Sequence, residues 1–288
     1  MIRFRPQGRN TNIEPYWDLV KRIIKESDIV LEVLDARLVE LSRNEEVERL
    51  IDEIGRPLIF VINKVDLVAK ERLKNQVKEL SKKGKVVFVS ANDTKSIKIL
   101  LFNIRKTFDK YGKREETVRI KGDPKQRFRE AKADIVVGIL GYPNVGKSSI
   151  INALCHKKKV KVSNRPGTTH GIHWIRASDD IKLIDSPGVI PLQKDDEVRY
   201  GLIGAKHSDR LKEPGLVADA VINLFLNHNK EALEELYRIK INDEISTPYE
   251  IIEEIARKNS FLLKGGIPDE NRAIDRIVKD WQDGKLRV

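Results

Sequence analysis

Two short motifs in this chain of 288 residues have the residue types and spacing to bind a guanine nucleotide between them. The first, Asn63-Lys64-Val65-Asp66, follows the apolar run 58–62. A carboxylate such as Asp66 can accept hydrogen bonds from guanine N1–H and from the exocyclic amine, a donor pair that adenine lacks. Asn63 and the aliphatic stem of Lys64 would pack around the base. This motif therefore favours guanine over adenine.

The second motif, Gly141-x4-Gly146-Lys147-Ser148, follows the apolar run 135–140 and precedes a helical pattern. Its glycines let backbone N–H groups approach a β-phosphate without obstruction from side chains. Lys147 would bring positive charge to the β- and γ-phosphates, and the Ser148 hydroxyl would bind Mg²⁺. The predicted phosphate-binding residues are Asn144, Val145, Gly146, Lys147, Ser148, Ser149 and, further along the chain, Gly188.

Three further segments complete the pattern of a GTP-binding switch. Ser90-Ala91-Asn92 ends the apolar run 86–89 and would place a backbone N–H on the guanine carbonyl. Asp185-Ser186-Pro187-Gly188 ends another run; Asp185 would hold Mg²⁺ through water, and the Gly188 N–H would meet the γ-phosphate. Pro166-Gly167-Thr168-Thr169 would supply a threonine to Mg²⁺ when the γ-phosphate is present, and Thr169 is preferred over Thr168.

The catalytic part of the switch lacks its usual glutamine. Many GTPases orient the attacking water with a glutamine directly after the Asp-x-x-Gly turn, whereas Val189 and Ile190 stand here. Slow intrinsic hydrolysis is expected. Asn144 has an amide oxygen suited to hold K⁺ near the phosphates, where the cation would stabilise the transition state; the alternative is that Asn144 only shapes the loop. The predicted catalytic set is Asn144, Lys147, Thr169 and Gly188.

Apolar runs that alternate with helical patterns would position these motifs. Strands are predicted over 29–34, 58–62, 86–89, 135–140, 172–177 and 181–184, and helices over 15–26, 43–54, 69–82, 96–110 and 147–154. This alternation is typical of an α/β domain with a mostly parallel sheet and helices on both faces. After residue 195 strand signals end, and helices are predicted over 216–226, 230–239, 248–258 and 271–283.

The predicted organisation is an N-terminal arm at 1–12, a GTPase domain at 13–192 and a helical domain at 195–288. The basic segment 109–133, which contains Gly112, Gly122 and Pro124, breaks the alternation and is expected to be a linker within the GTPase domain. The single cysteine, Cys155, excludes an internal disulfide, and no apolar run reaches the length needed to cross a membrane. A cytoplasmic protein is expected.

Charge is unevenly distributed over the chain, whose net charge is +11. Residues 1–133 hold 31 basic and 21 acidic side chains, residues 134–194 hold 9 and 4, and residues 195–288 hold 15 and 19. A positive GTPase domain indicates a polyanionic partner such as RNA. The alternative to a polyanionic partner is an ordinary solvated surface that is rich in lysine. The acidic helical domain would contact RNA through a local basic face or would bind protein instead.

The motifs occur in a rotated order, because the guanine-reading motif precedes the phosphate loop. With Asp35-Ala36-Arg37 after the first predicted strand, Ser42-Arg43-Asn44 further on, and Leu263-Lys264-Gly265-Gly266 before the last helix, the chain resembles the circularly permuted GTPases of the YlqF/YawG (RbgA-like) family. The resemblance implies a permuted P-loop GTPase fold and a role in large-ribosomal-subunit assembly. The family's N-terminal histidine has no counterpart here, and Glu45 stands where many relatives have proline.

The resulting hypothesis is a monomeric GTPase that uses Mg²⁺ and a candidate K⁺, and that binds ribosomal RNA or a large-subunit precursor in a nucleotide-gated manner. Stimulation by the particle and by K⁺ is expected. Two alternatives stay open: a GTPase acting on tRNA or small-subunit RNA, and a GTP-bound RNA-binding scaffold that does not hydrolyse GTP.

Overall fold

A six-stranded sheet organises the first two thirds of the chain in the computed structural model, which describes residues 14–69, 71–73, 77–113, 135–155, 173–185 and 196–288. The strands are β1 (Ile29–Asp35), β2 (Leu58–Asn63), β3 (Lys85–Phe88), β4 (Ile135–Leu140), β5 (His173–Arg176) and β6 (Ile181–Asp185). Their order is β3-β2-β1-β4-β6-β5, and all neighbours are parallel except the pair β5–β6. The predicted mostly parallel sheet is confirmed.

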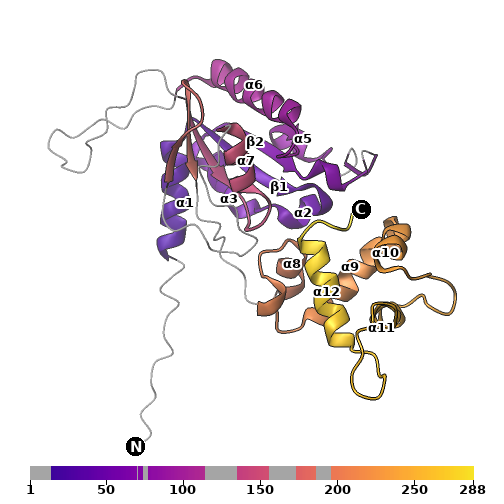
Figure 1. The fold of residues 1–288 in the computed structure, drawn as a ribbon. Helices are drawn as coiled ribbons and strands as arrows, with labels where there is room; N and C mark the ends of the chain where they lie inside the picture. The colour runs from indigo at the N-terminus through magenta and orange to yellow at the C-terminus, as the bar shows by residue number, and fades with distance from the viewer. Residues whose placement is uncertain (1–13, 70, 74–76, 114–134, 156–172, 186–195) are drawn as a thin grey trace, which may run out of the picture.

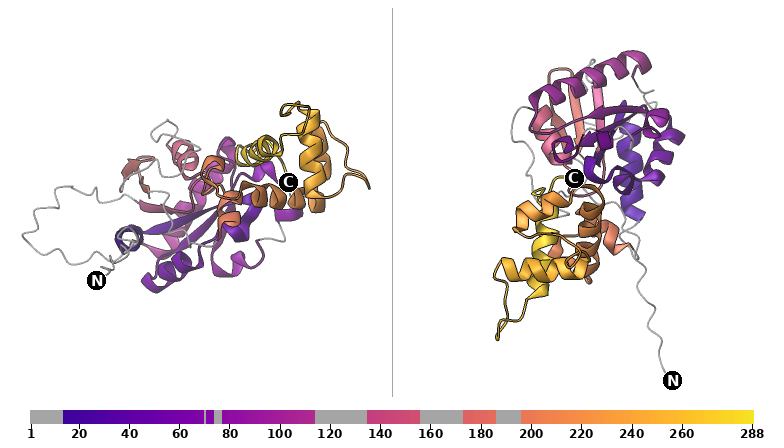
Figure 2. Two further views of the ribbon diagram at one scale, coloured as in Figure 1. Left: turned by 90° about the horizontal axis from the view of Figure 1, so that it is seen from below. Right: turned by 90° about the vertical axis from the view of Figure 1, so that its right-hand side faces the viewer.

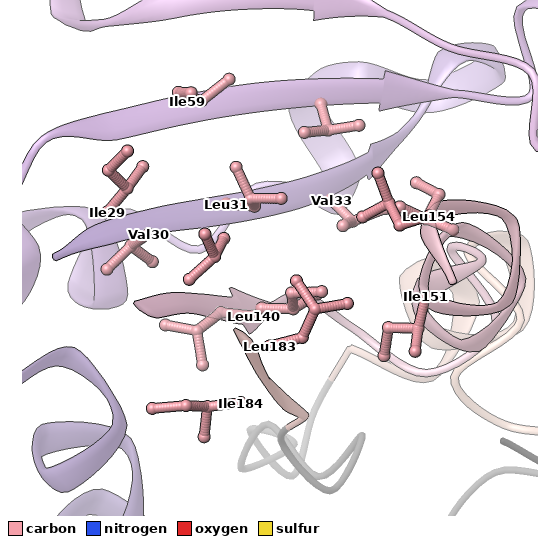
Figure 3. Close-up of a cluster of buried hydrophobic side chains, with 14 of the residues drawn as sticks. Ile29, Val30, Leu31, Val33, Ile59, Leu140, Ile151, Leu154, Leu183 and Ile184 are labelled. Carbon is pink, nitrogen blue, oxygen red and sulfur yellow. The ribbon is translucent and has the colours of Figure 1, made fainter. Parts of the chain in front are cut away.

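The central strands are apolar on both faces because helices cover the sheet from both sides. Every residue of β1 is buried, and so is every residue of β4. In Figure 3, Leu31 and Val33 of β1 lie toward Ile151 and Leu154 of helix α7 (Lys147–Leu154). Continuous apolar sequence, rather than alternation, is the expected signature of strands packed in this way.

Helices α1 (Glu14–Glu26) and α3 (Glu45–Ile54) pack against each other on one side, and α6 (Thr94–Tyr111) packs with α7 on the other (Figures 1 and 2). Side-chain caps fix where these helices start: Asn44 accepts from two backbone N–H groups of α3, and Asp93 does the same for α6. Gly55, with φ 74°, ends α3 in the left-handed conformation that favours glycine. The helices that carry the site are thus fixed by local sequence signals.

The helix predicted over 69–82 is wrong as a single element. Residues 71–73 are helical, residues 77–79 form a turn, and α5 covers only Leu80–Lys83. Short elements that were not predicted follow β1 and β2: η1 (Ala36–Leu38), α2 (Val39–Ser42) and η2 (Val65–Leu67). Helix α6 extends into the start of the predicted linker, whose residues 114–133 lie outside the described part, as does the arm at 1–12.

Helices make up the C-terminal region, as predicted, and form a body beside the sheet (Figure 1). They are α8 (Glu197–Leu202), η3 (Ser208–Arg210), α9 (Pro214–His228), α10 (Lys230–Tyr237), α11 (Pro248–Lys258) and α12 (Glu270–Gln282). Their core includes Phe225 and Trp281, whose rings meet edge to face at 6.0 Å. The domain limits themselves stay predictions. Among the described helices, none has the length and apolar character to cross a bilayer.

Candidate functional site

The carboxyl ends of four neighbouring strands bring the predicted motifs to one edge of the sheet. β1 ends at Asp35, β2 at Asn63 and β6 at Asp185, and β4 leads into Gly141. Strand order runs outward in both directions from the β1–β4 pair, so this edge is a topological switch point. Open parallel sheets bind ligands at such points.

The loop from β4 to α7 follows a tight path that requires two of its glycines. Gly141 has φ 144°, and a Cβ there would lie 2.6 Å from the Val33 carbonyl oxygen. Gly146 has φ 102°, and a Cβ there would lie 2.1 Å from Asn63 Nδ2. The loop therefore passes against β1 and β2 and delivers its backbone N–H groups to the start of α7, the geometry that binds phosphate.

Lys147 is buried at the start of α7, where Nζ donates to the carbonyl oxygens of Gly141 at 2.8 Å and Tyr142 at 2.7 Å. Burial lowers the pKa of Lys147 to about 8, although the nearby charge of Asp185 opposes the shift. Burial likewise raises the pKa of Asp185 to about 6, against the effect of Lys147 and His173. Both groups are therefore poised for a charged ligand that would stabilise their ionised forms.

Asp185 has a buried carboxylate oxygen, Oδ2, with no hydrogen-bond partner in the part of the chain that the structure describes. An unpaired buried oxygen of this kind is costly unless a ligand or cation meets it. Ser148 and Ser149 are partly exposed and lie in the first turn of α7, directly after Lys147. Oxygen donors of this type fit a hard cation such as Mg²⁺.

Asn63 joins the guanine-reading motif to the phosphate loop. Its Nδ2 donates to the Val145 carbonyl oxygen at 2.9 Å, across 82 residues of sequence. Its Oδ1 is buried and has no hydrogen-bond partner within the described segments. The two predicted motifs are therefore in direct contact.

Lys64 and Asp66 follow Asn63 in a short, strained turn. Lys64 has φ 63°, a backbone conformation that residues with a Cβ rarely adopt. Its Nζ contacts Asp35 Oδ2 at 2.8 Å. Asp66 lies in η2 and is exposed to solvent. Its carboxylate is therefore accessible to a nucleotide base.

The Ser90-Ala91-Asn92 segment lies beside this turn because β3 pairs with β2. The Val65 N–H approaches the Val89 carbonyl oxygen at 3.4 Å. Ser96 Oγ then binds both the N–H and the carbonyl of Ser90, at 3.1 and 3.0 Å. Ala91 is partly exposed and Asn92 is exposed. The structure therefore brings together the two segments predicted to read guanine.

Asn144, the candidate K⁺ ligand, makes a contact that the sequence did not reveal. It has φ 62°, and its Nδ2 donates to the Gly204 carbonyl oxygen at 2.6 Å, beyond helix α8. Next to it, the Arg199 guanidinium lies 5.5 Å from the centre of the Tyr142 ring. The helical region therefore contacts the phosphate loop directly.

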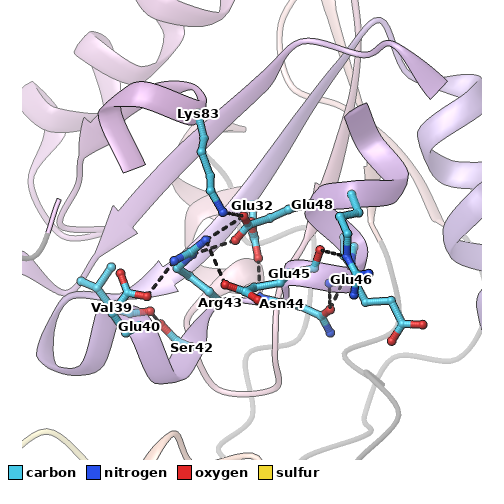
Figure 4. Close-up of polar contacts among 12 residues, drawn as sticks. Glu32, Val39, Glu40, Ser42, Arg43, Asn44, Glu45, Glu46, Glu48 and Lys83 are labelled. Carbon is cyan, nitrogen blue, oxygen red and sulfur yellow. Dashed lines mark hydrogen bonds and ion pairs between the residues drawn. The ribbon is translucent and has the colours of Figure 1, made fainter. Parts of the chain in front are cut away.

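The Ser42-Arg43-Asn44 segment also has a structural role, shown in Figure 4. Arg43 makes two hydrogen bonds with Glu48, each 2.8 Å long, and one with Glu40 at 2.7 Å. The Asn44 N–H donates to Glu32 Oε1 at 3.0 Å. Burial and the nearby Glu48 raise the pKa of Glu32 to about 8. This cluster fixes the connection from β1 to α3.

Several predicted residues lie outside the described ranges: Thr168, Thr169, Gly188, Val189 and Ile190. Their roles, and the catalytic use of Asn144 and Lys147, stay predictions. The sequence did not predict the contacts that Arg37, Arg199 and Trp281 make near the site. Asp35-Ala36-Arg37 was the available signal, since a charged pair at a strand end marks this edge.

Two GTPase family models match the chain on either side of residues 114–134. A model of 50S ribosome-binding GTPases matches residues 136–255, and a model of the elongation factor Tu GTP-binding domain matches residues 14–111. Two solved structures of YlqF are similar in fold: a GDP-bound form (24% identity, TM-score 0.59, 92% of this chain and 94% of that one) and a GNP-bound form from T. maritima (23%, 0.58, 94% and 94%).

Curated relatives match along nearly the whole chain. An uncharacterized GTP-binding protein of Methanocaldococcus jannaschii is 36% identical over 94% of this chain and 66% of its own length. Nucleolar GTP-binding protein 2 of Eremothecium gossypii is 33% identical over 94% and 50%, and GTPase grn1 of Schizosaccharomyces pombe is 29% identical over 96% and 62%. The chain thus spans about half to two thirds of these relatives' length.

Proposed function

Because the chain belongs to the circularly permuted, YlqF-like GTPases, we propose that it binds and hydrolyses GTP as a nucleotide-gated assembly factor of the large ribosomal subunit. The observation that supports nucleotide binding best is the hydrogen bond from Asn63 Nδ2 to the Val145 carbonyl oxygen. It holds a guanine-reading turn and a phosphate loop in one site, although the chain carries them in reversed order.

In this proposal each motif has a separate chemical task. Asp66 accepts from the guanine N1–H and amine, while the stem of Lys64 packs on the base. Backbone N–H groups of the loop and the Lys147 ammonium bind the phosphates. The Ser90-Ala91-Asn92 backbone meets the guanine carbonyl. Adenine would leave the Asp66 carboxylate without donors, so it binds poorly.

Magnesium is proposed as the cofactor, held by Ser148 and, through water, by Asp185, with Thr169 joining when the γ-phosphate is present. The unpartnered Oδ2 of Asp185 and the Ser148 hydroxyl in the first turn of α7 are oxygen donors of the kind that such a cation prefers. A bound Mg²⁺ would neutralise charge on the β- and γ-phosphates. K⁺ at Asn144 is a finer proposal, which rests on the amide side chain that this residue places in the phosphate loop.

The ribosomal partner is proposed from two kinds of support. The matched family model is described as 50S ribosome-binding, and two relatives are named as nucleolar GTP-binding proteins. The net charge of +11 suits ribosomal RNA. The proposed compartment is the one where large subunits are assembled, which is the nucleolus where a nucleus exists and the cytoplasm otherwise. A monomer is the proposed working state.

The base assignment is tested by Asp66→Asn, which exchanges an acceptor for an amide. GDP affinity is expected to fall about 100-fold while xanthosine diphosphate affinity rises, because xanthine offers a carbonyl where guanine has its amine. Titration with fluorescent nucleotide analogues measures both. Asp52→Asn, which removes the same charge from the exposed surface of α3, is the matched control. An unchanged preference for guanine would remove Asp66 from the base-reading role.

The cellular role is tested by GTP hydrolysis in K⁺ or Na⁺ with purified large subunits, small subunits or tRNA. Stimulation by large subunits alone supports the assembly proposal. Stimulation by tRNA or small subunits would support the first alternative. Negligible hydrolysis under every condition would support a GTP-bound scaffold.

A further inference from the structure

The segment that follows helix α12 pairs with the turn that is proposed to read guanine. The Val288 N–H donates to the Leu67 carbonyl oxygen at 2.9 Å, and the Ala69 N–H donates to the Val288 carbonyl oxygen at 3.1 Å. Val288 itself is buried. These two backbone hydrogen bonds hold the chain directly after Asp66, so residues more than 200 positions apart in sequence form one local structure.

A second connection runs through side chains to the other end of the same turn. Lys64 Nζ contacts Asp35 Oδ2 at 2.8 Å, and Arg37 binds both oxygens of Asp35, with Nε–Oδ1 at 3.0 Å and Nη2–Oδ2 at 2.8 Å. The remaining Arg37 nitrogen, Nη1, donates to the Trp281 carbonyl oxygen. The Arg37 guanidinium also lies 4.1 Å from the centre of a Trp281 ring.

Every member of this connection is fixed by burial or by a further bond. Asp35 and Arg37 are almost completely buried. Burial alone would raise the pKa of Asp35, but the charges of Arg37 and Lys64 hold it well below its usual range. Trp281 is completely buried, and its Nε1 donates to the Leu202 carbonyl oxygen at 2.7 Å. The carboxylate that anchors Lys64 is therefore itself anchored by α12.

Lys64 shows why this anchoring matters for the base. Its left-handed backbone is unfavourable for a residue with a Cβ, and such conformations persist where the surroundings over-determine them. The ion pair with Asp35 holds the side chain in place while Val288 holds the backbone three residues later. If these contacts were lost, the turn would be free to relax, and Asp66 would lose its position.

We propose that Arg37, Trp281 and Val288 are positioning residues for guanine recognition, so that helix α12 and the segment after it form the outer wall of the base-reading turn. This proposal rests on the proposed role of Asn63–Asp66 as that turn. Since coupling between two sites is reciprocal, a bound guanine base also strengthens the attachment of the segment 284–288. The contacts of α12 and the segment 284–288 lead to the base-reading turn and not to the γ-phosphate. GDP and GTP should therefore depend on them equally.

The test compares GDP with inorganic triphosphate, which can occupy only the phosphate loop. In the full chain, Arg37→Ala removes the partner of the buried Asp35 carboxylate, and Trp281→Ala removes the ring that packs on the Arg37 guanidinium. Each should weaken GDP binding about 10- to 100-fold. Triphosphate affinity, measured by calorimetry, should change less than about twofold. Trp281→Phe should restore near-normal GDP affinity, because a ring and the backbone carbonyl remain for Arg37.

Lys279→Ala is the matched control on α12: Lys279 and its ion-pair partner Asp275 are both about half exposed to solvent, and GDP affinity should not change. Hydrogen exchange on the unmodified chain provides a test that needs no variant. The Val288 and Ala69 amides should exchange more slowly with GDP than with triphosphate.

Equal losses of GDP and triphosphate affinity, or unchanged GDP affinity in both alanine variants, would overturn the proposal. If the alanine variants do not fold, exchange at Val288 that does not respond to GDP overturns it. A different result would instead refute the proposed function: failure of the unmodified chain to bind GDP, or an Asp66→Asn variant that keeps its preference for guanine.

Discussion

Gly146→Ala should disconnect the phosphate loop from the guanine-reading turn. The new Cβ would lie 2.1 Å from Asn63 Nδ2, and φ is 102° at this position. Asn63 is buried, and its Nδ2 donates to Val145 at 2.9 Å, so the side chain cannot move away without losing that bond. One substitution therefore strains the backbone and breaks the link between the two motifs.

The magnitude has two parts. A side chain at positive φ costs about 1–2 kcal/mol of unfolding free energy. The broken hydrogen bond leaves the buried Val145 carbonyl without its partner, which costs about 1–3 kcal/mol more. A total of about 2–5 kcal/mol is expected, measured by urea unfolding, together with a loss of GDP affinity of at least about tenfold, since Asn63 no longer positions the turn.

Gly55→Ala separates the two parts, because Gly55 has φ 74° and no atom within 4 Å of an added Cβ. This variant should lose only the unfolding free energy that comes from positive φ, and its GDP affinity should be unchanged. In an Asn63→Ala background, Gly146→Ala should also cost no more than the backbone part. The reasoning is refuted if Gly146→Ala destabilises no more than Gly55→Ala, or if its effect simply adds to that of Asn63→Ala.

Three other predictions use the charged groups of the structure. The Lys147 ammonium loses its proton in the free protein as pH rises through about 8. GDP affinity should therefore change little between about pH 7 and 8, above the pKa of Asp185, and fall up to about tenfold per pH unit above pH 8; affinity that stays flat to about pH 10 contradicts the assigned burial. Glu32 has a pKa of about 8 in the folded protein and 4.5 as the ordinary value, so the folded state binds more protons and stability falls as pH rises between these values. Glu32→Gln should reduce the difference in unfolding free energy between pH 5 and pH 8, measured by urea unfolding, by about 3–5 kcal/mol. A difference equal to that of the unmodified protein would exclude Glu32 as its source. Chelation of Mg²⁺ should weaken GTP binding in the unmodified chain but should have little effect in Asp185→Asn, and equal effects in both would exclude Asp185 from the magnesium site.

The sheet could be predicted from sequence because its strands are buried on both faces. Each predicted strand agrees with the structure to within a few residues, since strands such as β1 and β4 leave continuous apolar runs between helical patterns. The tight loop between β4 and α7 was equally predictable, because glycines at fixed spacing between a strand and a helix have few alternative uses. Gly141 and Gly146 have the positive φ values that such a loop requires.

Helical periodicity was less reliable where one surface could be buried in more than one way. Leu73, Val77 and Leu80 all enter the same apolar cluster, as a helix over 69–82 would require. The chain reaches this burial with a turn at 77–79 instead. Periodicity identifies which residues are buried, and it does not require a continuous helix.

Contacts between the sheet and the helical region could not be predicted. The pattern of α12 indicates that Trp281 is buried, but nothing in its spacing identifies Arg37, 244 residues earlier, as its partner. The same is true of Asn144 and Gly204. Such pairs are set by how two bodies dock, and a single sequence carries no periodic signal for docking.

The pairing of Val288 with residues 67 and 69 has a consequence for the order in which the protein is made. Synthesis proceeds from the N-terminus, so the guanine-reading turn emerges early, the phosphate loop that binds Asn63 emerges later, and the segment that closes the turn emerges after α12. Contacts so distant in sequence form slowly, because a long loop must close before they contribute any stability. With the site assignments proposed above, a growing chain has no finished nucleotide site, and GTP is expected to load only once the helical region has been synthesised and has folded onto the sheet.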